Sequence, residues 1–528
     1  MPRSGWAAHG NRPKKVAKLR SFTQALGGVA GAFFERTGIP PAQWQELANG
    51  IVGRLVLPGM PDYDDDRASN PRFNEYPQGI VYCAVPNDVR LALELARAHR
   101  EVSVTCRSGG HSTAGYSVNN GMVIDLSLMS YASVDKDKMT VTTGAGTSFE
   151  VFDSVLNTYA LHVPSGGCPD VCVGGYMQGG GYGFTTRQFG INCDRVVAFE
   201  MVLADGRVVT ADEKNHAPLF WGVRGGTGNQ FGVLTNVTYA LSSLKYVTGL
   251  VAMWSLEKDS APRVLSELQS SFMQSGAPRE FGYQVMITNP DPSKHAQPVL
   301  ILLAMYPGSE EDVRRIIAPL LAVAKPLTDP QYIRGTYDVL NATMVDNVLP
   351  GPGTPGTLEL KCSGYIAKPV GTDGWEEICS YMLGSPNPYN MAYLEIYGGA
   401  VNDAPQNHNA FIHRNVDCDF VIDSFYNPAW KGQYDGSVTE EQAQQWMDGL
   451  WARARPHTNG HVYQDYPDRT LSDYRWQYWG DAFPTLLAVK QAYDPTQLFH
   501  YGQPISPYPE GENITRSTAR PLFELSKP

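Results

Sequence analysis

The most distinctive chemistry in this chain belongs to a histidine that follows two glycines. Residues 106–111 have the sequence CRSGGH, and residues 168–172 have the sequence CPDVC and lead into the triple glycine of residues 179–181. Paired glycines let the backbone curl so that successive N–H groups point into one concavity, which suits a pyrophosphate. His111 could then bond one end of a bound cofactor and a thiol the other. Flavins are the cofactors known to accept two such bonds.

The elements around these motifs predict a mixed cofactor-binding module. Between residues 80 and 239, short β-rich runs alternate with amphipathic stretches, and we expect helices at 89–99 and 149–159 and a strand at 122–126. Residues 202–209 contain an Asp-Gly turn between two apolar runs, which predicts a hairpin. The fold class is therefore α+β. A Rossmann fold would need an acid about twenty residues after its glycine loop, whereas this loop carries a histidine.

The middle of the chain, from about residue 245 to 459, predicts one antiparallel sheet covered by helices. Its strand-like and helix-like segments alternate along the sequence. The expected strands are 250–256, 281–288, 299–305, 358–365, 392–397 and 419–426, and the expected helices are 260–273, 310–323 and 439–453. Residues 349–356, LPGPGTPG, form a loop by composition.

Composition and charge exclude several classes of protein. With 528 residues, 42% of them hydrophobic, the chain can bury the cores of two or three domains. The net charge of -11 argues against a nucleic-acid partner, and no apolar run is long enough for a membrane span. Eight cysteines are too few for a disulfide scaffold, so we expect most to be reduced and buried. Cys168 and Cys172 lack a matching downstream pair, so no metal site is predicted.

The first fifty residues combine basic positions with an apolar stretch at residues 22–34. Ala30-Gly31-Ala32 resembles a secretory cleavage site, but glycines dilute the apolar stretch and Glu35-Arg36 follow at once. We expect an exposed N-terminal helix and a cytoplasmic protein, with secretion as the alternative. The sequons at Asn236, Asn341 and Asn513 are of a kind that arises by chance in a chain of this size.

Taken together, these motifs resemble the berberine bridge enzyme-like branch of the vanillyl alcohol oxidase superfamily, whose motifs are SGGH and C-P-x-V-G. The similarity extends from about residue 54 to 507 and includes a second glycine-rich loop at 219–233. It implies a PCMH-type FAD-binding domain and a substrate domain. The implied boundaries are an N-terminal extension at 1–49, the FAD-binding domain at 50–244, the substrate domain at 245–460, and a C-terminal segment at 461–528 that returns to the FAD domain.

The resemblance implies FAD held by two covalent bonds. A ring nitrogen of His111 would bond the 8α carbon of the flavin. Cys168 occupies the family's cysteine position and keeps Pro169 and Val171, whereas Cys172 stands where the family has glycine. We therefore expect Cys168 to bond C6 of the isoalloxazine, with Cys172 or no thioether as alternatives. Val171 would then sit where a small gatekeeper residue admits oxygen, which implies an oxidase.

Further cofactor contacts follow from the same resemblance. They are Arg107, Ser108, Gly109, Gly110, Ser112, Gly174, Gly175, Gly179, Gly181, Gly183, Gly232, Val233 and Gln497. Gln497 replaces the asparagine of the family's Asp-Pro-x-Asn-x-Phe, and residues 229–232 depart from Gly-Asn-Phe-Gly. Both departures preserve hydrogen-bonding chemistry.

The expected catalytic residues are two tyrosines and a glutamate. Tyr182 matches the tyrosine that alcohol-oxidising relatives place over the flavin, and Tyr463 matches the first tyrosine of Tyr-x-Asn-Tyr, with Asp465 in place of Asn. A phenol acts as a base only if its neighbours stabilise the phenolate, and a carboxylate beside it raises its pKa. On an expected strand, Tyr463 and Asp465 would share a face and Tyr466 would point away. Glu395 is a second acid or base candidate. A structural role is the alternative for each.

The resemblance implies an FAD-dependent oxidase. Hydride would pass from an alcohol carbon of a carbohydrate or glycosylated secondary metabolite to flavin N5, while Tyr463, aided by Tyr182, takes the hydroxyl proton and O2 becomes H2O2. One alternative is oxidative C–C or C–N bond formation on an alkaloid- or polyketide-like substrate, with Glu395 as base. Another is a non-catalytic flavin-binding protein. The expected partners are a small-molecule substrate and O2.

Overall fold

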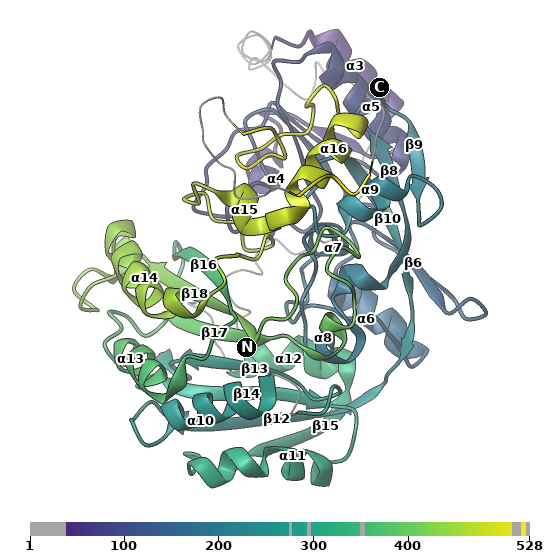
Figure 1. Cartoon of the computed structure of the whole chain (residues 1–528). Coiled ribbons are helices and arrows are strands. Elements are labelled where there is room, and N and C mark those ends of the chain that lie inside the picture. The colour runs from purple at the N-terminus through teal and green to yellow at the C-terminus, as the bar shows by residue number, and fades with distance from the viewer. Residues whose placement is uncertain (1–37, 274–276, 293–296, 349–353, 509–518, 524–528) are drawn as a thin grey trace.

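The computed structural model describes residues 38–273, 277–292, 297–348, 354–508 and 519–523 (Figure 1). The helix expected at residues 22–34, most of the loop at 349–356 and the sequon at Asn513 lie outside these described residues. Within the described part of the chain, no helix has the length and apolar character needed to cross a membrane. All eight cysteines are described, and none is in a disulfide.

The upper lobe in Figure 1 is built on two larger sheets and a two-stranded ribbon. A four-stranded sheet has the order β1-β2-β4-β3, with β1 Arg54–Val56, β2 Gly79–Tyr82, β3 Val104–Arg107 and β4 Met122–Asp125. A five-stranded antiparallel sheet has the order β5-β6-β10-β8-β9, with β5 Ala132–Asp135, β6 Thr140–Gly144, β8 Val196–Leu203, β9 Val208–Ala211 and β10 Gly232–Ala240. A two-stranded ribbon pairs β7 Leu161–His162 with β11 Ser242–Ser243. The predicted strand at 122–126 and the hairpin at 202–209 are confirmed by β4 and by the β8–β9 pair.

Helices of the upper lobe pack around these sheets. They are α3 Pro41–Gly50, α4 Tyr63–Arg67, α5 Pro86–Ala98, α6 Phe149–Thr158, α7 Val173–Gly179, α8 Thr186–Phe189 and α9 Ala217–Val223. The helices predicted at 89–99 and 149–159 are confirmed by α5 and α6. Trp44 of α3 is fully buried in the core of this lobe, so the described end of the expected N-terminal extension packs as part of the fold.

The C-terminal segment returns to the upper lobe. It contains α15 Tyr474–Trp479 and α16 Phe483–Tyr493, and Figure 1 shows α16 beside α9. Phe499 forms a parallel bridge with Val104 at the start of β3. The buried Lys490 ammonium donates to Asp494 at 2.7 Å and to the carbonyl of Phe499 at 2.5 Å. These bonds fix the end of the chain against the strand that leads to His111.

The lower lobe is built on one seven-stranded antiparallel sheet of order β15-β12-β14-β13-β17-β18-β16. Its strands are β12 Tyr246–Ser255, β13 Gly282–Thr288, β14 Val299–Tyr306, β15 Gln331–Thr336, β16 Leu358–Ile366, β17 Met391–Ile396 and β18 Cys418–Tyr426. Its helices are α10 Ala261–Glu267, which runs on into a π-helical turn at Leu268–Met273, α11 Glu310–Val323, α12 Tyr337–Val348, α13 Gly371–Leu383 and α14 Glu440–Ala454. The predicted antiparallel sheet, its six expected strands and its three expected helices are confirmed.

Alternation along the strands gives this sheet two different faces. On β17, Leu394 and Ile396 belong to the apolar core beneath α10, α11, α13 and α14, which lie on the outer side in Figure 1. Successive strand residues point to opposite faces. Tyr393 and Glu395 therefore point toward the upper lobe, and Tyr393 is buried in a separate cluster there.

A buried polar network joins the two lobes. Asp153 of α6 accepts hydrogen bonds from Ser165 Oγ at 2.7 Å and from Nδ2 of Asn341, on α12, at 3.3 Å. The Tyr337 hydroxyl lies 3.2 Å from Ser165 Oγ. Burial raises the pKa of Asp153 from 3.8 to about 7, although both hydrogen bonds act to lower it.

Replacing Asp153 with Asn should change how stability depends on pH. Because the pKa of Asp153 is raised on folding, stability falls as the pH rises from about 4 to about 7. At about 1.4 kcal/mol per pKa unit, this loss amounts to roughly 4 kcal/mol. Thermal unfolding at pH 5 and pH 8 should therefore show Asp153→Asn gaining on wild type at the higher pH. The control is Asp259→Asn, which changes an exposed carboxyl. If the difference in melting temperature between Asp153→Asn and wild type is the same at pH 5 and pH 8, the prediction is contradicted.

Candidate active site

The loop that carries His111 lies against the segment that carries the two candidate cysteines. Gly110 has φ +79°, a left-handed conformation that glycine adopts without strain. A Cβ at Gly109 would lie 3.0 Å from the Cys172 nitrogen and 3.2 Å from the Asp170 carbonyl. His111 Nε2 lies 3.4 Å from Asp170 Oδ2, and both side chains are partly exposed. The two predicted motifs are thus in direct contact.

Charged side chains stabilise the contact between the His111 loop and the cysteine segment. Burial acts to raise the pKa of Asp170, but the hydrogen bond and charge of His111 hold it below its ordinary value. At the base of the loop, Arg107 Nε donates to Asp125 Oδ2 at 2.5 Å, and its side chain is almost fully buried. Arg107 therefore ties the end of β3 to β4 and fixes the origin of the loop.

The two candidate thiols lie in different environments. Cys172 is 2% exposed, and its Sγ donates to the Gly146 carbonyl at 3.4 Å. Burial raises the pKa of Cys172 to about 12. Cys168 is exposed. Because the thiolate is the reactive form, the Cys172 thiol is a poor nucleophile at neutral pH.

The predicted cofactor glycines divide into two groups. At most of them an added Cβ would meet protein atoms at 3.0 Å or closer, namely at Gly109, Gly174, Gly179, Gly181, Gly183 and Gly232. At Gly110 and Gly175 the nearest atoms would be 3.6 Å and 3.9 Å away. The nearest atom to Gly175 is Ser108 Oγ, so Ser108 lies beside the second open glycine. The open backbone at Gly110 adjoins the exposed His111 in sequence, and Cys168 is the exposed thiol of the segment that contacts this loop, which fits a cofactor that bonds both side chains.

Three further predicted cofactor contacts are Ser112, Val233 and Gln497. Val233 is fully buried in the core of β10, and Ser112 Oγ accepts a hydrogen bond from the Tyr116 nitrogen at 3.1 Å. Gln497 has φ +54°. Asparagine is several-fold enriched in this left-handed region, so the asparagine of the family motif suits the position better than Gln497 does.

Tyr463 and Asp465 form a hydrogen-bonded pair against the triple glycine. The Tyr463 hydroxyl donates to Asp465 Oδ2 at 2.9 Å and accepts from the Gly181 nitrogen at 2.7 Å. A Cβ at Gly179 would lie 1.8 Å from Asp465 Oδ1. Burial raises the pKa of Asp465 to about 8, with Glu395 raising it further and Tyr463 lowering it. Burial and then Asp465 raise the pKa of Tyr463 well above 10.

The strand expected at residues 463–466 is wrong. The segment is a turn in which the Tyr466 nitrogen donates to the Tyr463 carbonyl at 3.0 Å. The expectation that Tyr466 points away from Tyr463 is wrong for the same reason, because their rings meet edge to face at 5.1 Å. Tyr463 and Asp465 nevertheless lie together, as expected, and they form a hydrogen bond.

A second tyrosine–carboxyl pair lies beside the first. The Tyr466 hydroxyl donates to Glu395 Oε1 at 2.7 Å. Glu395 is 5% exposed, and its Oε2 is buried without a hydrogen-bond partner among the described residues. Burial raises the pKa of Glu395 to about 7, while Tyr466 and Lys361 act to lower it. Glu395 is therefore a buried carboxyl with one open hydrogen-bonding position.

A buried charge cluster lies on the same sheet face, and sequence reasoning missed its lysine, Lys361. Lys361 of β16 contacts Asp423, lies 3.1 Å from Glu359, and donates to the Tyr393 hydroxyl at 3.0 Å. Burial disfavours the ammonium, but Asp423 and Glu359 together raise the pKa of Lys361 above its ordinary value. The sequence pattern that could have revealed this cluster is the pair of charged residues at alternate positions, 359 and 361, of a strand that is otherwise half apolar.

Tyr182 is joined to the sheet and not to Tyr463. Its hydroxyl accepts from the Ile396 nitrogen at 2.8 Å and donates to the Tyr283 carbonyl at 3.3 Å. Its ring stacks on Tyr397 at 5.4 Å. Burial raises the pKa of Tyr182 well above 10. These contacts hold Tyr182 against the lower sheet.

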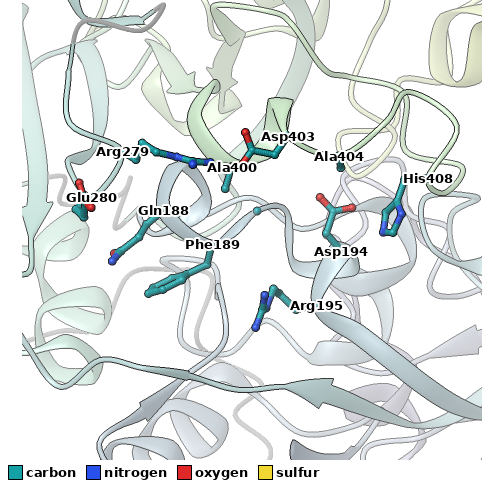
Figure 2. Close-up of a pocket in the computed structure, with 11 residues that line it drawn as sticks. Gln188, Phe189, Asp194, Arg195, Arg279, Glu280, Ala400, Asp403, Ala404 and His408 are labelled. Atoms are coloured by element: carbon teal, nitrogen blue, oxygen red, sulfur yellow. Dashed lines mark hydrogen bonds and ion pairs between the residues drawn. The ribbon is translucent and has the colours of Figure 1, made fainter. Parts of the chain in front are cut away.

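A surface pocket of about 620 Å³ lies elsewhere, and none of the predicted site residues lines it (Figure 2). Figure 2 shows Arg279 and Asp403 on one side and Asp194 on the other. Arg279 forms an ion pair with Asp403, and Asp194 pairs with Arg414 at 2.8 Å. These ion pairs neutralise three of the charged side chains that line the pocket, Arg279, Asp403 and Asp194.

Two family models match parts of this chain. Residues 77–212 match the model of an FAD binding domain, and residues 462–506 match the berberine and berberine-like model. The first match contains His111 and Cys168, and the second contains Tyr463 and Asp465.

Individual relatives cover nearly the whole chain. The FAD-linked oxidoreductase YgaK of Bacillus subtilis is 28% identical over 473 residues, 87% of this chain and 97% of the relative. A carbohydrate oxidase of Microdochium nivale is 26% identical, covering 86% and 92%. The structure of Physcomitrella patens BBE-like 1 superposes with a TM-score of 0.76 at 25% identity, covering 88% and 99%.

Fold, site and relatives together define a flavoprotein oxidoreductase. The chain contains an FAD-binding domain and a berberine-like domain and is similar over most of its length to FAD-linked oxidoreductases and to a berberine bridge enzyme-like structure, and FAD is its cofactor. The alternative of a non-catalytic flavin-binding protein is therefore set aside.

Replacing Gly179 with Ala should push the Asp465 carboxyl away from the glycine run of the FAD-binding domain. The new methyl would need the space of the Asp465 carboxyl, 1.8 Å away, so the Tyr463–Asp465 hydrogen bond should break. Overpacking of this kind costs about 1–3 kcal/mol. We expect thermal unfolding at a temperature several degrees lower than in wild type. In the control Gly384→Ala, the nearest atom is 3.5 Å away, and little change is expected. Equal melting temperatures for the two variants would contradict the packing described.

Proposed function

We propose that the protein is an oxidase that acts on the carbinol carbon of a carbohydrate or glycosylated secondary metabolite. The observation that carries the proposal is the Tyr463–Asp465 pair, a phenol bonded to a largely desolvated carboxyl beside the glycine run of the FAD-binding domain. The carbohydrate oxidase of Microdochium nivale supports this substrate class. When bound, FAD supplies the hydride acceptor and returns the electrons to O2, which becomes H2O2.

The chain's own residues would supply the proton acceptor. Tyr463 Oη takes the proton of the substrate hydroxyl while its own hydrogen passes to Asp465 Oδ2, 2.9 Å away. The Gly181 N–H, 2.7 Å from the same oxygen, stabilises the negative charge that develops there. The general base is thus the pair, because Asp465 has the lower pKa of the two groups.

His111 and Cys168 would hold the cofactor covalently in this proposal. His111 presents a partly exposed imidazole beside the open backbone at Gly110, and Cys168 is the exposed thiol of its loop. The high pKa of the buried Cys172 disfavours it as the second attachment point. Attachment through a ring nitrogen withdraws electrons from the flavin, which favours oxidation of a difficult substrate.

The covalent attachment can be tested on denatured protein. Wild type should be heavier than the polypeptide by one FAD and fluoresce in a denaturing gel. Single variants His111→Ala and Cys168→Ala should each keep the adduct through the other bond, and the double variant should lose it. Cys172→Ala should behave as wild type, with His111→Ala/Cys172→Ala as the matched double control. A wild-type mass equal to the bare polypeptide, or loss of the adduct in this control, would contradict the assignment.

The two carboxyl groups should appear in the pH dependence of peroxide formation from an alcohol substrate. A base must be deprotonated, so kcat/KM should rise with pH through about 8, and Asp465→Asn should remove that rise. Tyr463→Phe should lower kcat by about 10²–10⁴-fold. Tyr182→Phe is the comparison variant, since it keeps the ring stacking and should lose far less. An Asp465→Asn profile that still rises through pH 8 would show that another group is the base.

One alternative function is oxidative C–C or C–N bond formation on an alkaloid- or polyketide-like substrate. The observation that favours it is the open Oε2 position of the buried Glu395. In that case a basic amine should be turned over, Glu395→Gln should abolish turnover, and Tyr463→Phe should not.

A further inference from the structure

We propose that Asp170 activates His111 for its bond to FAD by holding the proton of the imidazole Nε2. The inference rests on the covalent attachment proposed above and assigns the step that forms it. It concerns a residue that takes no part in substrate oxidation, and it follows from how the two loops meet.

The carboxylate is positioned by its own loop. The Val171 carbonyl accepts from the Phe149 nitrogen at 3.0 Å, and the Pro169 carbonyl accepts from the Glu150 nitrogen at 2.8 Å. Both donors lie in the first turn of α6, so the backbone on each side of Asp170 is anchored to a helix. The Cys168 carbonyl accepts from the Val171 nitrogen at 3.3 Å, which closes a turn around Asp170. The backbone that carries the carboxylate is therefore held in place next to the His111 loop.

His111 is presented to that carboxylate by the glycine turn. Gly109 packs on the Asp170 carbonyl, Gly110 turns the chain at φ +79°, and Nε2 of His111 then lies 3.4 Å from Asp170 Oδ2. The low pKa of Asp170 keeps it ionised beside the ring. A carboxylate at one ring nitrogen fixes the tautomer, so the proton stays on Nε2 and the lone pair stays on Nδ1.

The chemistry of attachment matches this arrangement. Nδ1 forms a bond to the flavin 8α carbon as one C–H bond of that methyl group breaks, and the two electrons of that bond reduce the flavin. Asp170 stabilises the imidazolium that forms and receives its Nε2 proton. Molecular oxygen takes the two electrons together with the two released protons and becomes H2O2. Asp170 therefore speeds formation of the bond, and it also determines which nitrogen is used.

The test uses the Cys168→Ala background, in which His111 is the remaining attachment point. Cys168→Ala and Cys168→Ala/Asp170→Asn are purified in parallel, and covalent FAD is followed over time by intact mass and in-gel fluorescence. We expect the Asp170→Asn substitution to slow attachment at least tenfold. It should leave dissociable FAD bound and the melting temperature unchanged, and Asp170→Glu should restore part of the rate. Asp137→Asn, an exposed acid on the same lobe, is the matched control.

Two results would overturn the proposal. One is attachment at the Cys168→Ala rate in the Asp170→Asn double variant. The other, measured on wild type by NMR of the isolated flavin peptide, is a bond through Nε2 instead of Nδ1. A Cys168→Ala protein that carries no adduct at all would instead overturn the covalent attachment on which the inference rests.

Discussion

The approach of Asp465 to Gly179 is the constraint on which the site depends. The carboxyl occupies the space where a side chain at position 179 would begin, only 1.8 Å from an added Cβ. This contact brings the C-terminal segment onto the FAD-binding lobe and places the Tyr463 hydroxyl on the Gly181 N–H. It also removes water from Asp465, and this burial raises its pKa to about 8. The contact between Asp465 and Gly179 therefore accounts both for the packing of the site and for the raised pKa of Asp465.

The lower sheet contributes Glu395 to the site because successive side chains along its strands point to opposite faces. Leu394 and Ile396 pack beneath the helices, and Glu395, which lies between them in sequence, points to the other lobe. Burying carboxyl groups is costly unless they are paired. The structure pairs Glu395 with Tyr466, and Asp423 with Lys361. This polar face borders the tyrosine–carboxyl pairs.

Local pattern predicted much of the fold. Amphipathic and alternating segments predicted α11, α14 and six strands of the lower sheet. The strand β15 was missed because it is a largely exposed edge strand without alternation. The turn at residues 463–466 was missed because a strand period was assumed for four residues whose conformation is set by contacts with Gly179 and Gly181.

The sequence predicted several residues of the candidate site but not which side chains contact one another. Family motifs predicted His111 and Tyr463, and an expected strand predicted Glu395. Partners distant in sequence, such as Lys361 and Asp423, become neighbours only in the folded sheet. The choice between Cys168 and Cys172 depends on burial, which spacing alone does not determine.

The central claim is that burial against Gly179 makes the Asp465 carboxyl basic enough to take a proton. Infrared difference spectroscopy of this carboxyl tests the claim most directly. The account predicts a protonated-carboxyl band in wild type at pH 6 that Asp465→Asn lacks, and that disappears as the pH rises through about 8. If wild type and Asp465→Asn give the same spectrum at pH 6, then Asp465 is already ionised there, and the proposed proton acceptor is contradicted.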